Sequence, residues 1–135
     1  MTDKAGLYLV DIDVDCEGIL GGPRLALNLM VNAPEGKVYG SGEISQSGTA
    51  PGSEGHKIPA ISGHIYHTGF GQDTMLVSLR GRYAIPFGPT MPGQTEGMMI
   101  AALALDSSWE GGGTFHYGAN GDQVCARARV SRHQK

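Results

Sequence analysis

The sequence predicts an all-β fold, and more specifically a single antiparallel eight-stranded meander barrel. Apolar residues alternate with polar ones in runs of strand length, and clusters of Gly, Pro, Asn, Asp and Ser separate these runs. The chain has 22 glycines among 135 residues, and no long segment has a helical period with caps. A two-sheet β-sandwich is the alternative architecture. We expect residues 1–135 to form one β domain in which 131–135 are a disordered tail.

The strongest local prediction is a hairpin with a four-residue turn at positions 33–36. Gly36 supplies the positive φ that such a turn needs near its end. If Asn32 faces Lys37, the leucines before the turn and the apolar residues after it share one buried face. The eight predicted strands are Leu7–Cys16, Arg24–Asn32, Lys37–Gln46, Ile58–Thr68, Asp73–Ala84, Gly97–Asp106, Thr114–Tyr117 and Gln123–Val130.

Closing the first strand on the last would remove both edges of the sheet. With the apolar faces of the two strands turned inward, Asp13 would lie opposite Arg127 and Asp11 opposite Arg129, as an outward ladder of ion pairs. The same alternation turns Cys16 inward and Cys125 outward. A disulfide would need a bulge or a strand end to turn one of them around, so we predict free thiols.

Composition excludes several classes of function. The net charge is −3 and no Lys/Arg cluster offers a footprint for phosphates, so we expect no nucleic-acid partner. The N-terminus has no apolar region typical of a signal peptide, and the longest apolar run, Met98–Leu105, is too short to span a bilayer. The default location is therefore the cytoplasm, with export by a route that needs no signal peptide left open.

Chemical motifs are weak. The acidic stretch Asp11–Asp15 lacks the Gly and Glu of an EF-hand, although a looser calcium site with Glu17 and a neighbouring loop is an alternative to the ion pairs. His64 and His67 are three residues apart and point to opposite faces of a regular strand. No nucleophile motif is present, and we expect no cofactor, no metal site and no catalytic residue.

The connections alternate between two ends of the predicted meander. The longer ones, rich in Gly, Pro and Ser, are residues 17–23, 47–57, 85–96 and 118–122, and they gather at one end. This long-loop rim is either the functional surface or a set of tolerated insertions. The candidate ligand-binding residues, chosen for position and chemistry, are Glu54, His56, Tyr83, Phe87, Met91 and Gln94.

Two apolar features of the sequence would be exposed to solvent unless another part of the protein shields them. The run Met98–Leu105 is apolar on both faces, so we expect either a homo-oligomer interface or the folded-over segment Ile85–Glu96 to shield its outer face. Trp109 lies at the short-loop end, where it is either an exposed anchor or, as we prefer, a plug that closes the barrel floor.

Three segments carry a resemblance: Leu27–Gln46, Leu76–Gly81 and the stretch Leu105-Asp-Ser-Ser-Trp-Glu-Gly-Gly-Gly-Thr-Phe-His-Tyr117. In this order they resemble an uncharacterised proteobacterial domain family of unknown function, which implies bacterial origin and brings no site residues. The topology is similar to the avidin-like and lipocalin-like barrels. The chain has one tryptophan and begins its first strand Gly6-Leu-Tyr8, so the resemblance implies neither a biotin site nor a lipocalin ligand.

Three hypotheses of function follow. The first is a non-enzymatic binding or interaction module that uses the long-loop rim for an unknown small molecule or protein. The second is a small hydrolase or isomerase, which needs a buried polar pair near His56 or His64 with a perturbed pKa. The third is a structural or surface-exposed protein that forms oligomers and binds no small ligand.

Overall fold

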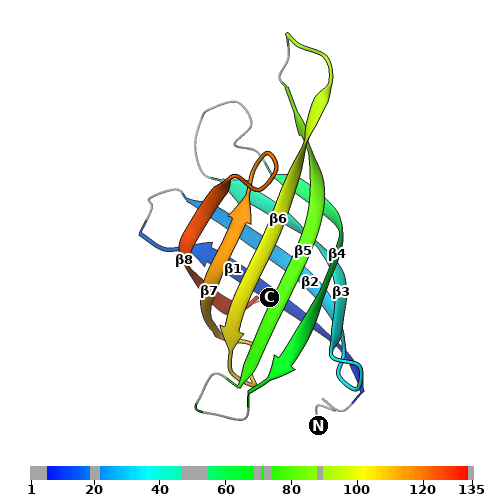
Figure 1. The fold of residues 1–135 in the computed structure, drawn as a ribbon, viewed down its shortest axis with the longest axis vertical. Coiled ribbons are helices and arrows are strands. Elements are labelled where there is room, and N and C mark those ends of the chain that lie inside the picture. The colour runs from blue at the N-terminus through cyan, green and yellow to red at the C-terminus, as the bar shows by residue number, and fades with distance from the viewer. Residues whose placement is uncertain are drawn as a thin grey trace.

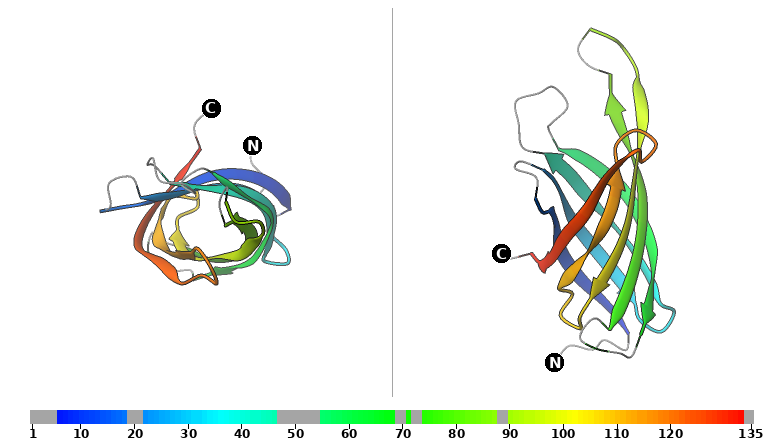
Figure 2. Two further views of the ribbon diagram at one scale, coloured as in Figure 1. Left: turned by 90° about the horizontal axis from the view of Figure 1, so that it is seen from above. Right: turned by 60° about the vertical axis from the view of Figure 1, so that its left-hand side comes forward.

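The structure, a computed structural model, describes residues 6–18, 22–46, 55–68, 71, 74–87 and 90–133. These residues form eight antiparallel strands that follow one another around a closed barrel, with β1 paired to β8 (Figure 1; Figure 2, left). The meander barrel is confirmed and the sandwich alternative is wrong. The strands are β1 (Leu7–Cys16), β2 (Pro23–Asn32), β3 (Lys37–Gln46), β4 (His56–His67), β5 (Met75–Pro86), β6 (Gln94–Leu105), β7 (Gly111–Tyr117) and β8 (Gln123–Arg132).

The β2–β3 hairpin has the predicted register. Asn32 lies opposite Lys37 and Val31 opposite Val38, and the pairing continues to Pro23 and Gln46. Gly36 closes the turn with φ +67° and donates its N–H to the Ala33 carbonyl oxygen at 3.2 Å. Because the strand period is two, this register buries the leucines of β2 together with Val38 and Ile44 of β3.

Gly40 marks a corner of the barrel. A Cβ atom at this position would lie 2.0 Å from the backbone carbonyl oxygen of Asn28, so only glycine lets the strands approach this closely. The register of β3 against β4 shifts between Gly40 and Gly42. The glycines therefore allow β3 to bend, as expected of a barrel corner.

Trp109 closes the floor of the barrel, as predicted. Asp106 organises the β6–β7 turn, because its carboxylate accepts the N–H groups of Ser108 at 2.8 Å and Glu110 at 3.1 Å. The turn holds Trp109 at φ +64° with only 1% of its surface exposed, and its Nε1–H donates to the Tyr8 hydroxyl at 3.2 Å. Apolar side chains from all eight strands fill the space above it.

The seam between β1 and β8 has a different register from the predicted one. Val14 lies opposite Val130 and Asp13 opposite Ser131, so the predicted pairs Asp13–Arg127 and Asp11–Arg129 are wrong. The observed register lies four residues from the predicted one, and because four is an even number Ala128 and Val130 still face inward. A separate one-residue bulge in β8 lies before this paired stretch, where Gly113 faces Ala128 but Phe115 faces Cys125. The extra residue leaves Ala126 and Arg127 both exposed and turns Cys125 inward.

The acidic row of β1 bonds to other partners. Asp13, which is buried, accepts from Arg24 of β2 at 3.2 Å and lies 2.9 Å from Nδ1 of His133. Asp15 also contacts Arg24, at 3.1 Å, and Asp11 accepts from the Asn28 amide. Ser131 and Arg132, which the sequence placed in the tail, extend β8, and residues 134–135 lie outside the described residues.

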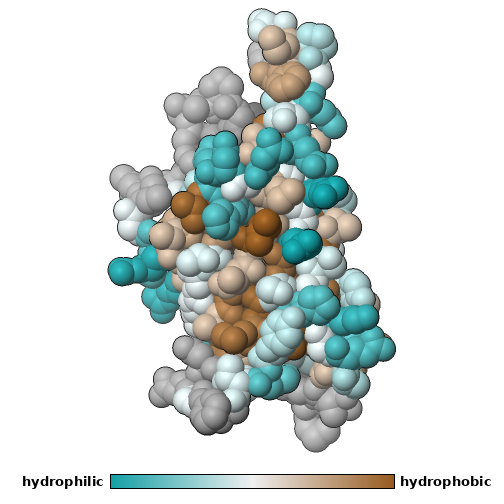
Figure 3. Space-filling view, in the orientation of Figure 1, coloured by the Kyte–Doolittle hydropathy of each residue, from teal (hydrophilic) through white to brown (hydrophobic). Residues whose placement is uncertain are grey.

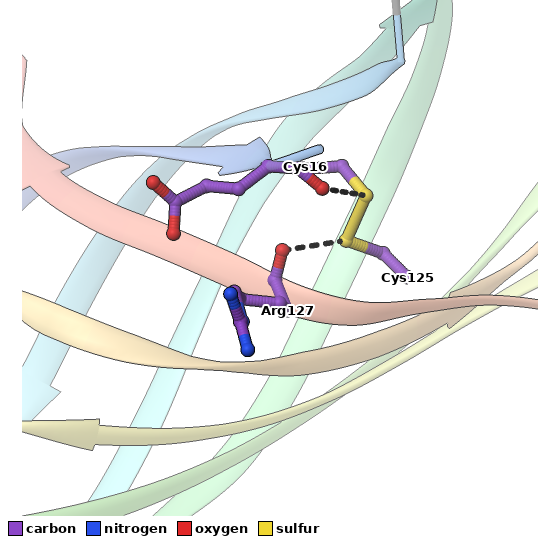
Figure 4. Close-up of a disulfide and its surroundings, with 4 residues drawn as sticks. Cys16, Cys125 and Arg127 are labelled. Carbon is purple, nitrogen blue, oxygen red and sulfur yellow. Dashed lines mark hydrogen bonds between the residues drawn. A yellow bond between two sulfur atoms is a disulfide. The ribbon is translucent and has the colours of Figure 1, made fainter. Parts of the chain in front are cut away.

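The two cysteines form a disulfide across the seam, so the prediction of free thiols is wrong (Figure 4). The Cα atoms of Cys16 and Cys125 are 5.8 Å apart. The Arg127 carbonyl oxygen lies 3.3 Å from the Cys125 sulfur, which is a contact and not a hydrogen bond because the bridged sulfur carries no hydrogen. The bulge in β8 supplies the one change of direction that a disulfide required, because it turns Cys125 inward while Cys16 at the end of β1 packs against the core as predicted.

The outer face of β6 remains uncovered along the described chain. Ile100 is 39% exposed and Ala102 is exposed beside it. The alternative of a folded-over loop is wrong, because β5 and β6 stay paired as far as Pro86 and Gln94 and project beyond the barrel as a long hairpin (Figure 1; Figure 2, right). Within the described ranges, no helix is long and apolar enough to cross a membrane.

The disulfide should be a major source of stability, because it links residues that are 109 positions apart and so restricts the unfolded chain. The double variant Cys16→Ser/Cys125→Ser should lose about 2–4 kcal/mol of unfolding free energy, measured by urea denaturation. A reductant should lower the stability of the parent by a similar amount and leave the double variant unchanged. Equal urea midpoints for the oxidised and reduced parent would contradict this expectation.

Candidate functional site

A small pocket opens at the long-loop end of the barrel, where the interior is no longer filled. Its volume is about 280 Å³. Strand ends and the β7–β8 turn form its walls, so the closure of the barrel is what brings them together. We call it the mouth pocket, and it is lined by Pro23, Ile44, Ser45, His56, Tyr83, Ile85, Thr95, Tyr117, Gly118, Ala119 and Gln123.

Tyr83 is the most firmly held polar side chain of the mouth pocket. It lies on β5 opposite Gly97 of β6, and its ring covers the glycine so closely that a Cβ there would be 2.6 Å from the ring. Its hydroxyl oxygen accepts the backbone N–H of Gly118 at 2.8 Å. With 6% of its surface exposed, Tyr83 has one orientation imposed by both contacts.

Burial raises the pKa of the Tyr83 phenol above its ordinary value of 10.0, because the charged phenolate would be poorly solvated. The hydrogen bond from Gly118 opposes the shift, and the nearby Tyr117 adds to it. The phenol is therefore neutral at physiological pH. Since its oxygen already accepts a bond from the protein, its own O–H is the group that it offers to a ligand.

His56 forms the wall beside Tyr83. It is the first residue of β4 and lies opposite Ile44 of β3. Its ring stacks on Tyr83 with the ring centroids 5.9 Å apart and the planes inclined by 28°. This pair gives the mouth pocket a planar aromatic surface next to the phenol hydroxyl.

The structure divides the candidate ligand-binding residues into two groups. His56 and Tyr83 lie together in the mouth pocket. Phe87, Met91 and Gln94 lie on the projecting β5–β6 hairpin instead, where Phe87 is 52% and Met91 59% exposed. Figure 3 shows the apolar surface at the tip of this hairpin. Glu54 lies outside the described residues.

Sequence reasoning missed most of the apolar lining. Ile44, Ile85 and Tyr117 each lie at or next to the end of a strand that meets the long-loop rim. The sequence does indicate which residues lie near this end of the barrel, because every second strand boundary of a meander falls at the same end. What the sequence alone does not give is which end residues turn toward the pocket.

The mouth pocket combines apolar and uncharged polar side chains. Its described lining contains aromatic rings, hydroxyl groups and one glutamine amide, with neither a carboxylate nor a thiol. Along the described chain, no group of three or more His, Cys, Asp or Glu side chains could hold a metal ion. His64 and His67 are exposed near the other end of β4, where His67 lies opposite Met75 at the start of β5.

The fold and the pocket define a class: a closed antiparallel β-barrel with a filled interior and a small pocket at one mouth. The chain belongs to the family described as Domain of unknown function (DUF1842), which matches residues 5–123. The resemblance to a family of unknown function is thus confirmed. No curated protein matches the chain.

Tyr83 should make the unfolding free energy of the protein depend on pH in the alkaline range. Since folding raises the pKa of its phenol, the neutral form stabilises the protein below pH 10.0, and this contribution is lost as the pH rises through that value toward the folded pKa. In Tyr83→Phe, the unfolding free energy should fall less steeply over this range. Near neutral pH the variant should be about 1 kcal/mol less stable, because Gly118 loses its acceptor.

Urea denaturation at a series of pH values measures both effects. Tyr66→Phe is the matched control, because the Tyr66 side chain is exposed on the outer face and should leave the alkaline profile of the parent in place. If the unfolding free energies of the parent and of Tyr83→Phe fall equally steeply with rising pH, the Tyr83 phenol does not have the raised pKa.

Proposed function

We propose that the protein is a non-enzymatic binding module whose mouth pocket takes a small ligand. The observation that carries the proposal is the Tyr83 hydroxyl, which is buried at the mouth, held by Gly118 and left with its proton to donate. A neutral donor fixed inside a mostly apolar hollow is how ligand pockets obtain orientation and specificity.

The lining narrows the class of ligand. A volume of about 280 Å³ suits a small molecule or the terminal group of a larger one. Ile44, Ile85 and the ring of Tyr117 offer apolar contact, and His56 offers a planar surface. The proposed ligand therefore has a compact apolar or aromatic body and one hydrogen-bond acceptor that reaches Tyr83.

The projecting hairpin adds a second contact in this proposal. Phe87 and Met91 are exposed beyond the barrel, in the connection between β5, which carries Tyr83, and β6. Exposed aromatic and methionine side chains are enriched in binding surfaces. Phe87, Met91 and Gln94 would contact the part of a ligand or protein partner that extends above the mouth.

A fragment screen by two-dimensional NMR tests the mouth pocket. Fragments with a hydrogen-bond acceptor on an aromatic ring should shift the amide signals of Tyr83, Gly118 and Ala119. Tyr83→Phe should weaken binding about tenfold, the effect of one lost hydrogen bond of ordinary strength. Tyr66→Phe serves as the control with unchanged binding. A screen in which fragments leave these amides unmoved, or bind Tyr83→Phe as tightly as the parent, would refute the proposal.

Assembly through the outer face of β6 is the second candidate function. A groove of about 260 Å³ runs over this face and is lined by Tyr66, Leu76, Ala102, Ala104 and Gly113 among others. Figure 3 looks onto this region, where apolar side chains gather over β6. A homo-oligomer interface would bury them, as proposed for the apolar run of β6.

Light scattering after size-exclusion chromatography tests assembly. The proposal expects an oligomer that Leu76→Lys dissociates and that Val124→Lys, at another exposed apolar position on β8, leaves intact. A monomer at high protein concentration would refute it. The enzyme alternative has less support, because the described lining of the mouth pocket offers no acidic or thiol group to act with His56.

The disulfide also bears on location. Cytoplasmic thiols are kept reduced, whereas disulfides persist in oxidising compartments. The Cys16–Cys125 bridge therefore supports an oxidising compartment, rather than the default to the cytoplasm, as the proposed place of action. Alkylation of free thiols in intact cells of the source organism would show which redox state the protein holds there.

A further inference from the structure

A second concave surface lies on the outside of the barrel, over β3–β6. Two adjoining hollows of about 450 Å³ and 540 Å³ share Ser62 of β4, Arg80 of β5 and Ile100 of β6 in their lining. Because they share these residues, they form one continuous depression, which we call the outer groove. It is separate from the mouth pocket, with which it has no described lining residue in common.

Basic side chains line the outer groove. Arg80 and Arg82 are two residues apart on β5, so both side chains point outward. Lys37 of β3 and His64 of β4 lie opposite each other at the far end. The described lining contains no carboxylate, although the whole chain has a net charge of −3.

The arginines have little to neutralise them. Arg82 lies 3.8 Å from Glu96, and both side chains are more than half exposed, so this ion pair contributes little. Among the described residues, Arg80 forms no ion pair. Two guanidinium groups on neighbouring outward positions are thus available for an anion, which each can bind through paired N–H donors.

An apolar wall faces these cations. Ile100 lies directly opposite Arg80, and Met98 directly opposite Arg82, across the β5–β6 ladder. Pro59 and Ala60 of β4 line the other side of the same hollow, and the Ser62 hydroxyl lies on the strand position opposite Arg80. Figure 3 shows this juxtaposition, with apolar side chains over β6 beside hydrophilic ones over β5.

We propose that the outer groove binds an amphipathic organic anion, namely a carboxylate or phosphate head attached to an apolar body. The head lies between Arg80 and Arg82 and accepts from the Ser62 hydroxyl, and the body lies along Met98 and Ile100. The groove is complementary to such a molecule in both respects, because it combines unneutralised positive charge with an exposed apolar wall.

The competing explanation is that the arginines merely rest their methylene stems on apolar surface and keep their charges in water. This explanation predicts no preference for anions. The proposal therefore depends on selectivity between head groups that carry the same apolar body.

Calorimetric titration of the full chain with octyl phosphate, octanoate, octanol and octyltrimethylammonium provides the test. The two anions should bind, shift the amide signals of Ser62, Gly81 and Ile100, and lose affinity as salt is added. Octanol and the cation should bind about tenfold more weakly or not at all, because they cannot accept charge-assisted hydrogen bonds from guanidinium groups.

Three variants test which residues bind the anion. Arg80→Gln/Arg82→Gln should weaken binding of octyl phosphate about tenfold or more, since it removes both guanidinium groups. Arg129→Gln, at an exposed position on β8, is the matched control with unchanged affinity, and Tyr83→Phe reports whether the mouth pocket takes the anion instead. Urea midpoints near that of the parent show that each variant is folded.

Equal binding of octanol and octyl phosphate would overturn the proposal, as would a double variant that binds like the parent. Binding to vesicles of anionic lipid without binding to monomeric octyl phosphate would also overturn it, because the groove would then recognise a membrane surface. Loss of binding in Tyr83→Phe alone would assign the anion to the mouth pocket instead.

Discussion

The closure of β1 on β8 is the constraint on which the other features depend. The seam has only five residue pairs, whereas β5 and β6 share twelve. Asp13 adds polar contacts to both Arg24 and His133, and the disulfide fastens the end of β1 to β8. Without this short seam the sheet would have two open edges, the interior would lose its boundary and the mouth pocket would not exist.

Closure also decides which surfaces could bind a ligand. Apolar side chains fill the barrel from the Trp109 floor upward, so little interior space remains below the mouth. The proposed contact groups therefore lie on two surfaces, with Tyr83 and His56 at the mouth and Arg80 with its neighbours outside. Both surfaces rely on β5, which places Tyr83 inward and the two arginines outward by simple alternation.

The parts of the fold that sequence predicts well are those set by local alternation and turn chemistry. The β2–β3 hairpin is such a case, because the alternation of the leucines in β2 and the turn that ends at Gly36 with a positive φ both predict the same register. The prediction of the seam fails because alternation sets which residues face inward but not how far β8 slides along β1, and the observed register differs by four residues while Ala128 and Val130 still face inward. The bulge in β8, which strict alternation from Gln123 to Val130 cannot reveal, reversed the direction of Cys125 and hid the disulfide. At the candidate site, His56 and Tyr83 were within reach of sequence reasoning, but their contact and the role of Gly118 depend on how separate strand ends converge.

The most direct test of the account is the register of the seam, measured by NMR through cross-strand contacts between backbone protons of β1 and β8. The structure predicts contacts between Asp13 and Ser131 and between Asp15 and Arg129. Contacts between Asp13 and Arg127 would instead support a register four residues away and contradict the seam described here. Absence of any contact between the two strands would contradict the closed barrel itself.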